Sequence, residues 1–102
     1  MKTETSNGNN GKDERSAEPP AELELIEMGK FYFLAGKYQE AKKEFNNALE
    51  INPNNPEIYF NLGVTSEACN EVESAKKVYE KAIKLDPAHK RARERLDKLI
   101  GL

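Results

Sequence analysis

Two arginines near the C-terminal end of the chain have the type and spacing to bind a carboxylate. Arg91 and Arg95 are four residues apart, so both side chains project from one face of an α-helix. A guanidinium group can donate two parallel hydrogen bonds to one carboxylate. The pair is therefore a candidate site for an acidic ligand. The alternative is that these basic residues, near the end of a helix, complement the helix dipole and stay solvated.

No combination of residues predicts catalysis, a metal site or a cofactor. His89 is the only histidine and Cys69 the only cysteine, too few for a metal site built from these ligands. Cys69 is expected to be a small buried thiol rather than a nucleophile. The glycines form no phosphate-binding motif. The sequence therefore predicts a protein that is not an enzyme.

The composition of the chain changes near residue 20. Residues 1–20 contain only Met1 and Ala17 from the hydrophobic set. Such a segment buries too little apolar surface to offset the entropy lost on ordering. We expect a disordered polar tail at 1–20 and one folded domain at 21–102. The tail has no apolar run typical of a secretory signal, and nothing later is long enough to span a membrane. A single cysteine best fits a reduced, cytoplasmic setting.

The charge is uneven along the chain. Residues 89–102 carry five basic and two acidic residues, whereas the net charge of all 102 residues is −2. A general attraction to nucleic acid does not follow from this balance. Nucleic-acid binding by the basic end is kept as a third hypothesis, and it predicts affinity that falls steeply with salt.

The elements that position these residues repeat at an offset of 34. Small residues and prolines recur as the pairs Gly29/Gly63, Ala41/Ala75, Ala48/Ala82 and Pro53/Pro87. A fixed period of this size is typical of stacked helical repeats, which build binding surfaces. Glycine costs about 1 kcal/mol relative to alanine inside a helix. Its return at one phase indicates close packing against large side chains, for which we expect Tyr32, Phe45, Tyr59 and Tyr79.

Apolar spacing and helix breakers predict five helices. The first begins at Glu22 and ends before Gly36, which suits a left-handed turn position. The others cover about 38–51, 56–69, 72–85 and 90–100, and prolines or turn residues separate them.

This alternation resembles the tetratricopeptide repeat. The residues that match it in the first unit are Leu25, Met28, Gly29, Tyr32, Gly36, Tyr38, Ala41, Phe45, Ala48 and Pro53. Those in the second unit are Tyr59, Leu62, Gly63, Ala75, Tyr79, Ala82 and Pro87. The second unit departs at Ser66, Asn70 and Val72. The resemblance implies an all-α superhelix of two helical hairpins, 22–55 and 56–89, followed by a C-terminal capping helix at 90–101.

The resemblance also implies that a protein or peptide partner binds in the concave groove of the array. Carried over by position, the groove residues are Ile26, Lys30, Phe33, Phe60, Asn61, Val64, Arg91 and Arg95. The four apolar ones would form the floor, and the arginines would form a basic end. The alternative is that some of the aromatic residues belong to the core or to a self-association surface.

Some members of the family grip the acidic C-terminal tail of heat-shock chaperones through a clamp of Lys, Asn, Asn, Lys and Arg. Asn61 and Arg95 match clamp positions, and Arg91 stands where the second Lys would be. Ile26 replaces the first Lys and Lys30 replaces the first Asn, so half of the clamp departs from the pattern. Binding of an acidic C-terminal peptide is therefore an alternative function.

The first helix lacks an N-terminal neighbour in this array. Its expected exposed flank includes Leu23, Ile26, Phe31 and Phe33. Each repeat gains most of its burial from its neighbours. Two repeats and a cap therefore form a domain with a small core. Two alternatives follow. The domain is a monomer of modest stability, or it is a homodimer in which a second copy covers this flank.

Overall fold

Five α-helices and no strand make up the part of the chain that this computed structural model describes, residues 21–102. They are α3 (Glu22–Leu34), α4 (Tyr38–Ile51), α5 (Pro56–Ala68), α6 (Val72–Leu85) and α7 (Lys90–Leu99). The predicted all-α class is confirmed, and the predicted helix ends agree to within one residue. The tail predicted at 1–20 lies outside the described residues.

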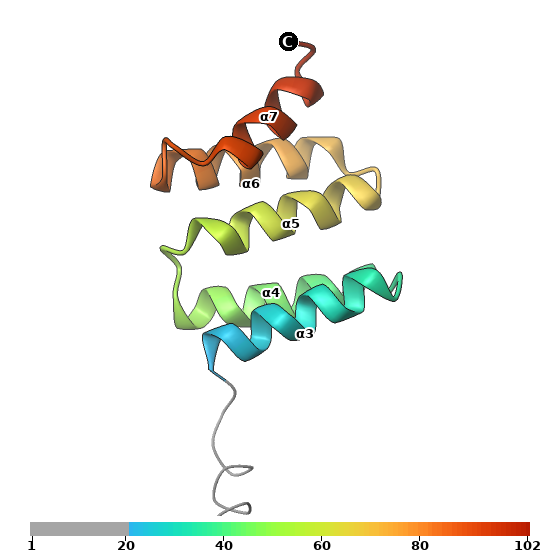
Figure 1. Ribbon diagram of the computed structural model, residues 1–102. Coiled ribbons are helices and arrows are strands. Elements are labelled where there is room, and N and C mark those ends of the chain that lie inside the picture. The colour runs from blue at the N-terminus through green and yellow to red at the C-terminus, as the bar shows by residue number, and fades with distance from the viewer. Residues whose placement is uncertain (1–20) are drawn as a thin grey trace, which may run out of the picture.

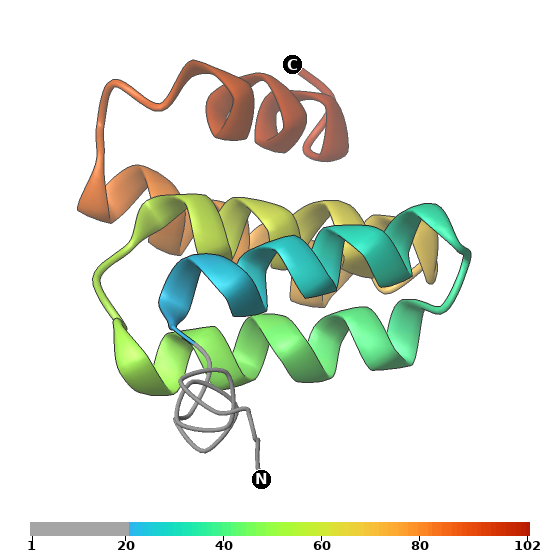
Figure 2. The same cartoon turned by 60° about the horizontal axis from the view of Figure 1, so that its bottom comes forward.

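The helices stack as two hairpins and a final single helix (Figure 1). Helix α3 pairs with α4, α5 pairs with α6, and α7 lies on α6. Helix α5 also packs on α4, which joins the two hairpins. Figure 2 shows α3 and α5 side by side. The first helices of the two hairpins are therefore neighbours, as a groove built from them requires.

Both hairpin turns use the same backbone motif with different residues. After α3, the amide of Gly36 donates to the carbonyl of Phe33, and the next amide reaches back to Tyr32. Gly36 has a φ of 77°. After α5, Asn70 takes this place with a φ of 61°, and its amide and that of Glu71 donate to the equivalent carbonyls. Asparagine tolerates the left-handed region better than most residues. Asn70 therefore stands in the place of the turn glycine without changing the turn.

Each hairpin closes where a glycine faces an aromatic ring. A Cβ atom added to Gly29 would overlap the ring of Phe45, and one added to Gly63 would overlap the ring of Tyr79. Phe45 and Tyr79 are fully buried. The prediction that glycine recurs to admit large partners is confirmed for these two pairs.

The buried side chains form two clusters, one for each hairpin. The first joins α3 and α4 to the facing side of α5, through Leu25, Ile26, Ala41, Phe45, Ala48, Ile58 and Leu62. The second joins α5, α6 and α7, through Phe60, Ala75, Tyr79, Ala82, Ala92 and Leu96. The expectation that Ile26 lies on an exposed flank is wrong, because its side chain is only 6% exposed and packs in the first cluster. Phe33 is half-buried against the same cluster, whereas Leu23 and Phe31 are exposed as expected.

The N-cap residues of α5 and α7 each contact a glutamate at the start of an earlier helix, α3 and α5 respectively. Asn55 caps α5 by accepting from the amide of Glu57, and its side-chain amide donates to Glu22. His89 caps α7 by accepting from the amide of Ala92 through Nδ1, and its Nε2 lies 3.1 Å from Glu57. Asn55 and His89 are 34 residues apart. Capping therefore also fixes the spacing between successive first helices.

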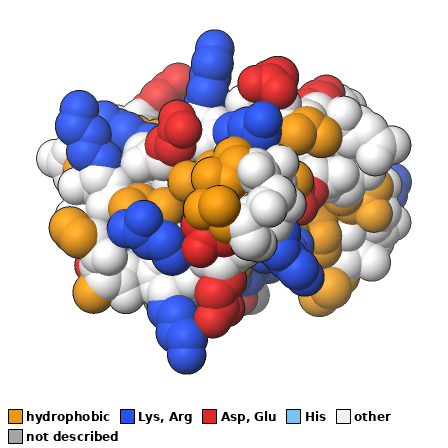
Figure 3. Space-filling view, turned by 90° about the horizontal axis from the view of Figure 1, so that it is seen from above, with side chains coloured by type: hydrophobic (Ala, Val, Ile, Leu, Met, Phe, Trp, Pro, Cys, Tyr) orange, Lys and Arg blue, Asp and Glu red, His pale blue; other side chains and the backbone are white. Residues whose placement is uncertain are grey.

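The end of the molecule that carries α7 presents charges of both signs. Seen along this direction, basic and acidic side chains surround a small apolar patch (Figure 3). Helix α7 exposes Lys90, Arg93 and Glu94, while Ala92 and Leu96 face the second cluster.

Candidate functional site

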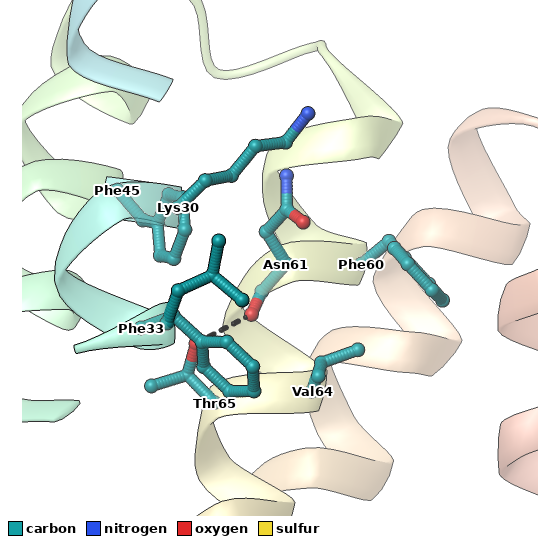
Figure 4. Close-up of a pocket in the computed structure, with 8 residues that line it drawn as sticks. Lys30, Phe33, Phe45, Phe60, Asn61, Val64 and Thr65 are labelled. Carbon is teal, nitrogen blue, oxygen red and sulfur yellow. Dashed lines mark hydrogen bonds between the residues drawn. The ribbon is translucent and has the colours of Figure 1, made fainter. Parts of the chain in front are cut away.

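A pocket of about 230 Å³ lies between α3 and α5. We call it the α3–α5 pocket, and its lining residues are Lys30, Phe33, Leu34, Phe45, Phe60, Asn61, Val64 and Thr65. Figure 4 shows these side chains, which belong to α3 and α5 except for Phe45 of α4. Small-molecule sites typically measure about 300–1,000 Å³, so this pocket suits the side chains of a peptide better than a whole small molecule.

One polar group in this pocket has no partner. Asn61 Nδ2 is buried and makes no hydrogen bond within residues 21–102. The backbone carbonyl of the same residue accepts from Thr65 Oγ1 at 2.8 Å, as the dashed line in Figure 4 marks. A buried donor without an acceptor costs about 1–3 kcal/mol. An acceptor brought by a ligand would recover that cost.

A second pocket of about 410 Å³ continues the surface toward α7. We call it the α5–α7 pocket, and it is lined by Phe60, Val64, Arg91, Glu94 and Arg95. Phe60 and Val64 line both pockets. The two pockets therefore form one groove across α3, α5 and α7.

Arg91 is held by a carboxylate of the chain itself. Its Nη2 donates to both oxygens of Glu57 at 2.8 Å. Its guanidinium carbon lies 4.5 Å from the centroid of the Phe60 ring, in a cation–π contact. His89 Nδ1 accepts from a backbone amide, so Nε2 carries the hydrogen and donates to Glu57.

The environment of Glu57 favours its charged form. Partial burial by itself raises the pKa of Glu57. Hydrogen bonds from Arg91 and His89, together with the charge of Arg91, outweigh burial and hold the pKa of this carboxyl below its ordinary value. Glu57 is therefore an ionised partner of Arg91 at neutral pH.

Arg95 is held in the same manner by a carboxylate at the other end of α5. Its Nε lies 3.1 Å from Glu67 Oε1. The hydroxyl of Tyr79 donates to the same oxygen at 2.5 Å and accepts weakly from Arg95 Nε at 3.4 Å. Burial of Tyr79, then its hydrogen bond to Glu67, raise the pKa of this phenol far above its ordinary value. The phenol therefore stays neutral and acts as a hydrogen-bond donor.

The structure brings seven of the eight predicted site residues into the groove. Lys30, Phe33, Asn61 and Val64 line the α3–α5 pocket, and the two arginines line the α5–α7 pocket. Phe60 lies between the pockets but is only 8% exposed, so it supports the groove floor more than it presents a free surface. The eighth residue, Ile26, is absent from both linings because it packs in the core below them.

The partners of the two arginines were not predicted from the sequence. Glu57 and Arg91 occupy the same position of successive units, 34 residues apart, and this offset was a usable signal. Glu67, Tyr79 and Arg95 show no such relation. His89, expected in a loop between helices, is the buried N-cap residue of α7.

Two other classes of site receive no support from the described residues. No helix within 21–102 has the length and apolar character needed to cross a bilayer. The same residues contain no group of three or more His, Cys, Asp or Glu side chains arranged to hold a metal ion.

Two overlapping family models match the sequence. The one described as "TPR repeat" covers residues 29–66, and the one described as "Tetratricopeptide repeat" covers residues 56–89. Anaphase-promoting complex subunit 3 of Schizosaccharomyces pombe is 33% identical over 75 residues, which cover 74% of this chain and 11% of that protein. Superkiller protein 3 of Saccharomyces cerevisiae is 42% identical over 45 residues, which cover 44% of this chain and 3% of that protein. The chain thus spans a small part of these curated relatives.

Solved structures of the same architecture superimpose on most of the chain. The first TPR of Spaghetti (RPAP3) bound to the HSP90 peptide SRMEEVD has a TM-score of 0.78 and 26% identity, covering 88% of this chain and 71% of that one. The first TPR domain of human RPAP3 has a TM-score of 0.79 with the same identity and coverage. Together, the repeat period, the helical hairpins, the family models and these neighbours lead to one conclusion. The chain belongs to the tetratricopeptide repeat family and contains about two repeats.

Proposed function

We propose that this domain is a non-enzymatic interaction module that binds an extended peptide segment of another protein in the groove across α3, α5 and α7. In this proposal, the hairpins at 22–55 and 56–89 form the two repeats, and the helix within 90–101 caps them. The peptide inserts an apolar side chain into the α3–α5 pocket, against Phe33 and Val64.

The observation that carries this proposal is the unpartnered Nδ2 of Asn61 in a pocket whose lining is mainly apolar. An extended peptide offers carbonyl oxygens along its whole backbone, so it can supply an acceptor while its side chain fills the pocket. A purely apolar ligand would leave the donor buried and unpaired, which is costly. The combination therefore favours a peptide over a lipid or a hydrocarbon surface.

The structural neighbours support this class of partner. The first TPR of Spaghetti (RPAP3), 26% identical to this chain, is bound to a peptide of HSP90. We extend only the class, peptide binding, to this chain. The apolar pocket and the unpartnered amide of this chain indicate which peptide groups would bind there, namely an apolar side chain and a backbone carbonyl.

Val64 gives a sharper test than Phe60. Glutamate at Phe60 would bring charge into the second cluster, where the ring lies 6.0 Å from that of Tyr79, and would unfold the cap as well as block the groove. Val64 is only partly buried and lines both pockets. A matched control is Val72→Glu, because Val72 is exposed at the start of α6 and lines neither pocket.

The experiment selects short random peptides displayed on phage against the full chain and measures the best binder by fluorescence anisotropy. We expect Val64→Glu to weaken binding at least about tenfold, since a buried charge opposes an apolar side chain. Val72→Glu should bind as the wild type does. Equal affinities of the two variants would place the binding site elsewhere.

A second candidate function is self-association through the outer face of α3. Ile58, Leu62 and Thr65 of α5 are buried against the first hairpin. The residues 34 positions earlier are Glu24, Met28 and Phe31, all of which are exposed. No helix within residues 21–102 covers this face, which Leu23 and Leu34 extend.

Sedimentation velocity at two concentrations tests this second candidate. A homodimer through α3 should dissociate on Phe31→Glu and persist with Val72→Glu. A wild-type chain that stays monomeric at high concentration would remove the dimer and leave peptide binding untouched.

A further inference from the structure

The arginines at the α7 end of the groove already have ligands, and these ligands are glutamates of the same chain. Glu57 receives hydrogen bonds from Arg91 and His89. Glu67 receives one from Tyr79 and forms an ion pair with Arg95. Both carboxylates are partly shielded from water, with side chains 33% and 25% exposed. Each one fills the position that a carboxylate of an acidic peptide would otherwise take.

The charges around the α5–α7 pocket do not add up to a basic site. Two arginines face three glutamates, namely Glu57, Glu67 and the pocket residue Glu94. Lys90 pairs with Glu94 at 3.9 Å, so the three basic and three acidic side chains of this cluster balance. An acidic peptide would have to displace Glu57 or Glu67 from its arginine, or lie beside them against like charge. Like-charge contact of this kind weakens binding and excludes wrong partners.

We propose that Glu57 and Glu67 determine the specificity of the groove, because they occupy Arg91 and Arg95 and so exclude peptides that carry carboxylates. The preferred occupant is a peptide with apolar side chains and no acidic residues at the segment that meets α7. This inference rests on the proposed peptide-binding function and adds the chemistry of the peptide.

Removing either glutamate charge should change the preference. Glu57→Gln removes the negative charge that pairs with Arg91, and Glu67→Gln does the same for Arg95. Glutamine keeps the size of the side chain, so packing is preserved. The two substitutions act at opposite ends of α5. If one of them disturbs folding, the other still tests the proposal.

Glu73→Gln is the matched control. Glu73 lies on α6 with a side chain 84% exposed and pairs only with Lys76 at 3.4 Å among the described residues. The variant removes one negative charge, as the test variants do, but far from the groove lining. Any general effect of net charge on peptide affinity is therefore measured directly.

The experiment uses two fluorescent probes with the full chain. One is the acidic peptide SRMEEVD, and the other is its neutral counterpart, with glutamine for glutamate and for arginine, asparagine for aspartate and both termini blocked. We expect the wild type to bind the neutral probe more tightly. Glu57→Gln and Glu67→Gln should each tighten binding of the acidic probe by about tenfold, in line with one charge contact, and Glu73→Gln should leave it within about twofold. The gain should shrink as salt rises, because the charges are partly exposed.

Two results would overturn the proposal. One is a wild type that prefers the acidic probe, and the other is a gain in the glutamine variants no larger than that of Glu73→Gln. The proposed function is judged separately, by whether binding of the neutral probe is lost in Val64→Glu. A groove that binds the neutral probe but shows no gain for the acidic one retains its function and loses this specificity. If no variant binds either probe, this specificity is wrong, and the phage-selected peptide alone decides the proposed function.

Discussion

Glu57 and Arg91 stand at the same position of consecutive first helices, 34 residues apart, and the arginine donates to both carboxylate oxygens at 2.8 Å. The corresponding residue of α3 is Leu23, which is exposed. The position that is apolar in α3 therefore carries a negative charge in α5 and a positive charge in α7. This pair ties α7 to α5.

Glu57 should stabilise the fold only above acidic pH. Its pKa is lowered in the folded protein, so the unfolded chain binds the proton more readily. The stabilisation is complete above the ordinary pKa of 4.5 and is lost as pH falls through the lower folded value. We expect Glu57→Gln to reduce the free energy of unfolding by about 0.5–1 kcal/mol at neutral pH, given that the pair is partly exposed. Thermal unfolding followed by circular dichroism should show the two proteins converging in acid. A difference independent of pH would contradict the assignment.

Gly29→Ala should destabilise the first hairpin despite the better helix propensity of alanine. The added Cβ overlaps the buried ring of Phe45. Overpacking of this kind costs about 1–3 kcal/mol, against a propensity gain of about 1 kcal/mol. Urea denaturation measures the net loss. In the double variant with Phe45→Leu, the effect of Gly29→Ala should become neutral or favourable, and additive losses would show that the ring is not the cause.

Asn70 should be improved by glycine and harmed by alanine. Its φ of 61° is in the left-handed region, where a Cβ atom costs about 1–2 kcal/mol and asparagine is tolerated better than alanine. Asn70→Gly should therefore keep or raise the free energy of unfolding, and Asn70→Ala should lower it by about 1 kcal/mol. Parallel urea curves for the three proteins check the order. A stabilising alanine would contradict the turn geometry.

Tyr79 should resist ionisation in the folded protein. Burial and the carboxylate of Glu67 raise the pKa of Tyr79 above its ordinary value of 10.0. The folded state then holds a proton that the unfolded chain releases, so stability falls as pH rises above that ordinary value. Ultraviolet titration of tyrosinate in the wild type, minus that of Tyr79→Phe, isolates this group. The difference curve should rise only when the protein unfolds, and a rise near the ordinary value in the folded protein would refute the contact with Glu67.

Local features of this fold could be predicted from the sequence, and contacts across repeats could not. Helix ends depend on nearby prolines and turn residues, and the small residue opposite Phe45 follows from the period. The prediction that Ile26 is exposed is wrong, because it was carried over from exposed positions of the family. In this chain, neighbouring side chains of the first cluster bury Ile26. The occupation of Arg91 by Glu57 depends on how far α7 lies from α5, which no local pattern encodes.

The uncovered face of α3 is the end of the array to which a further repeat could be added most easily. Of the three positions that meet the preceding helix in the second repeat, Met28 and Phe31 already carry apolar side chains in the first, and only Glu24 departs from the isoleucine at position 58. A further 34-residue unit fused ahead of α3 would therefore meet a surface that is already mostly apolar. The outer side of α7 instead exposes the charged residues Arg93 and Glu94. Since repeat arrays gain stability from each new interface, lengthening the groove by design should begin at the N-terminal end.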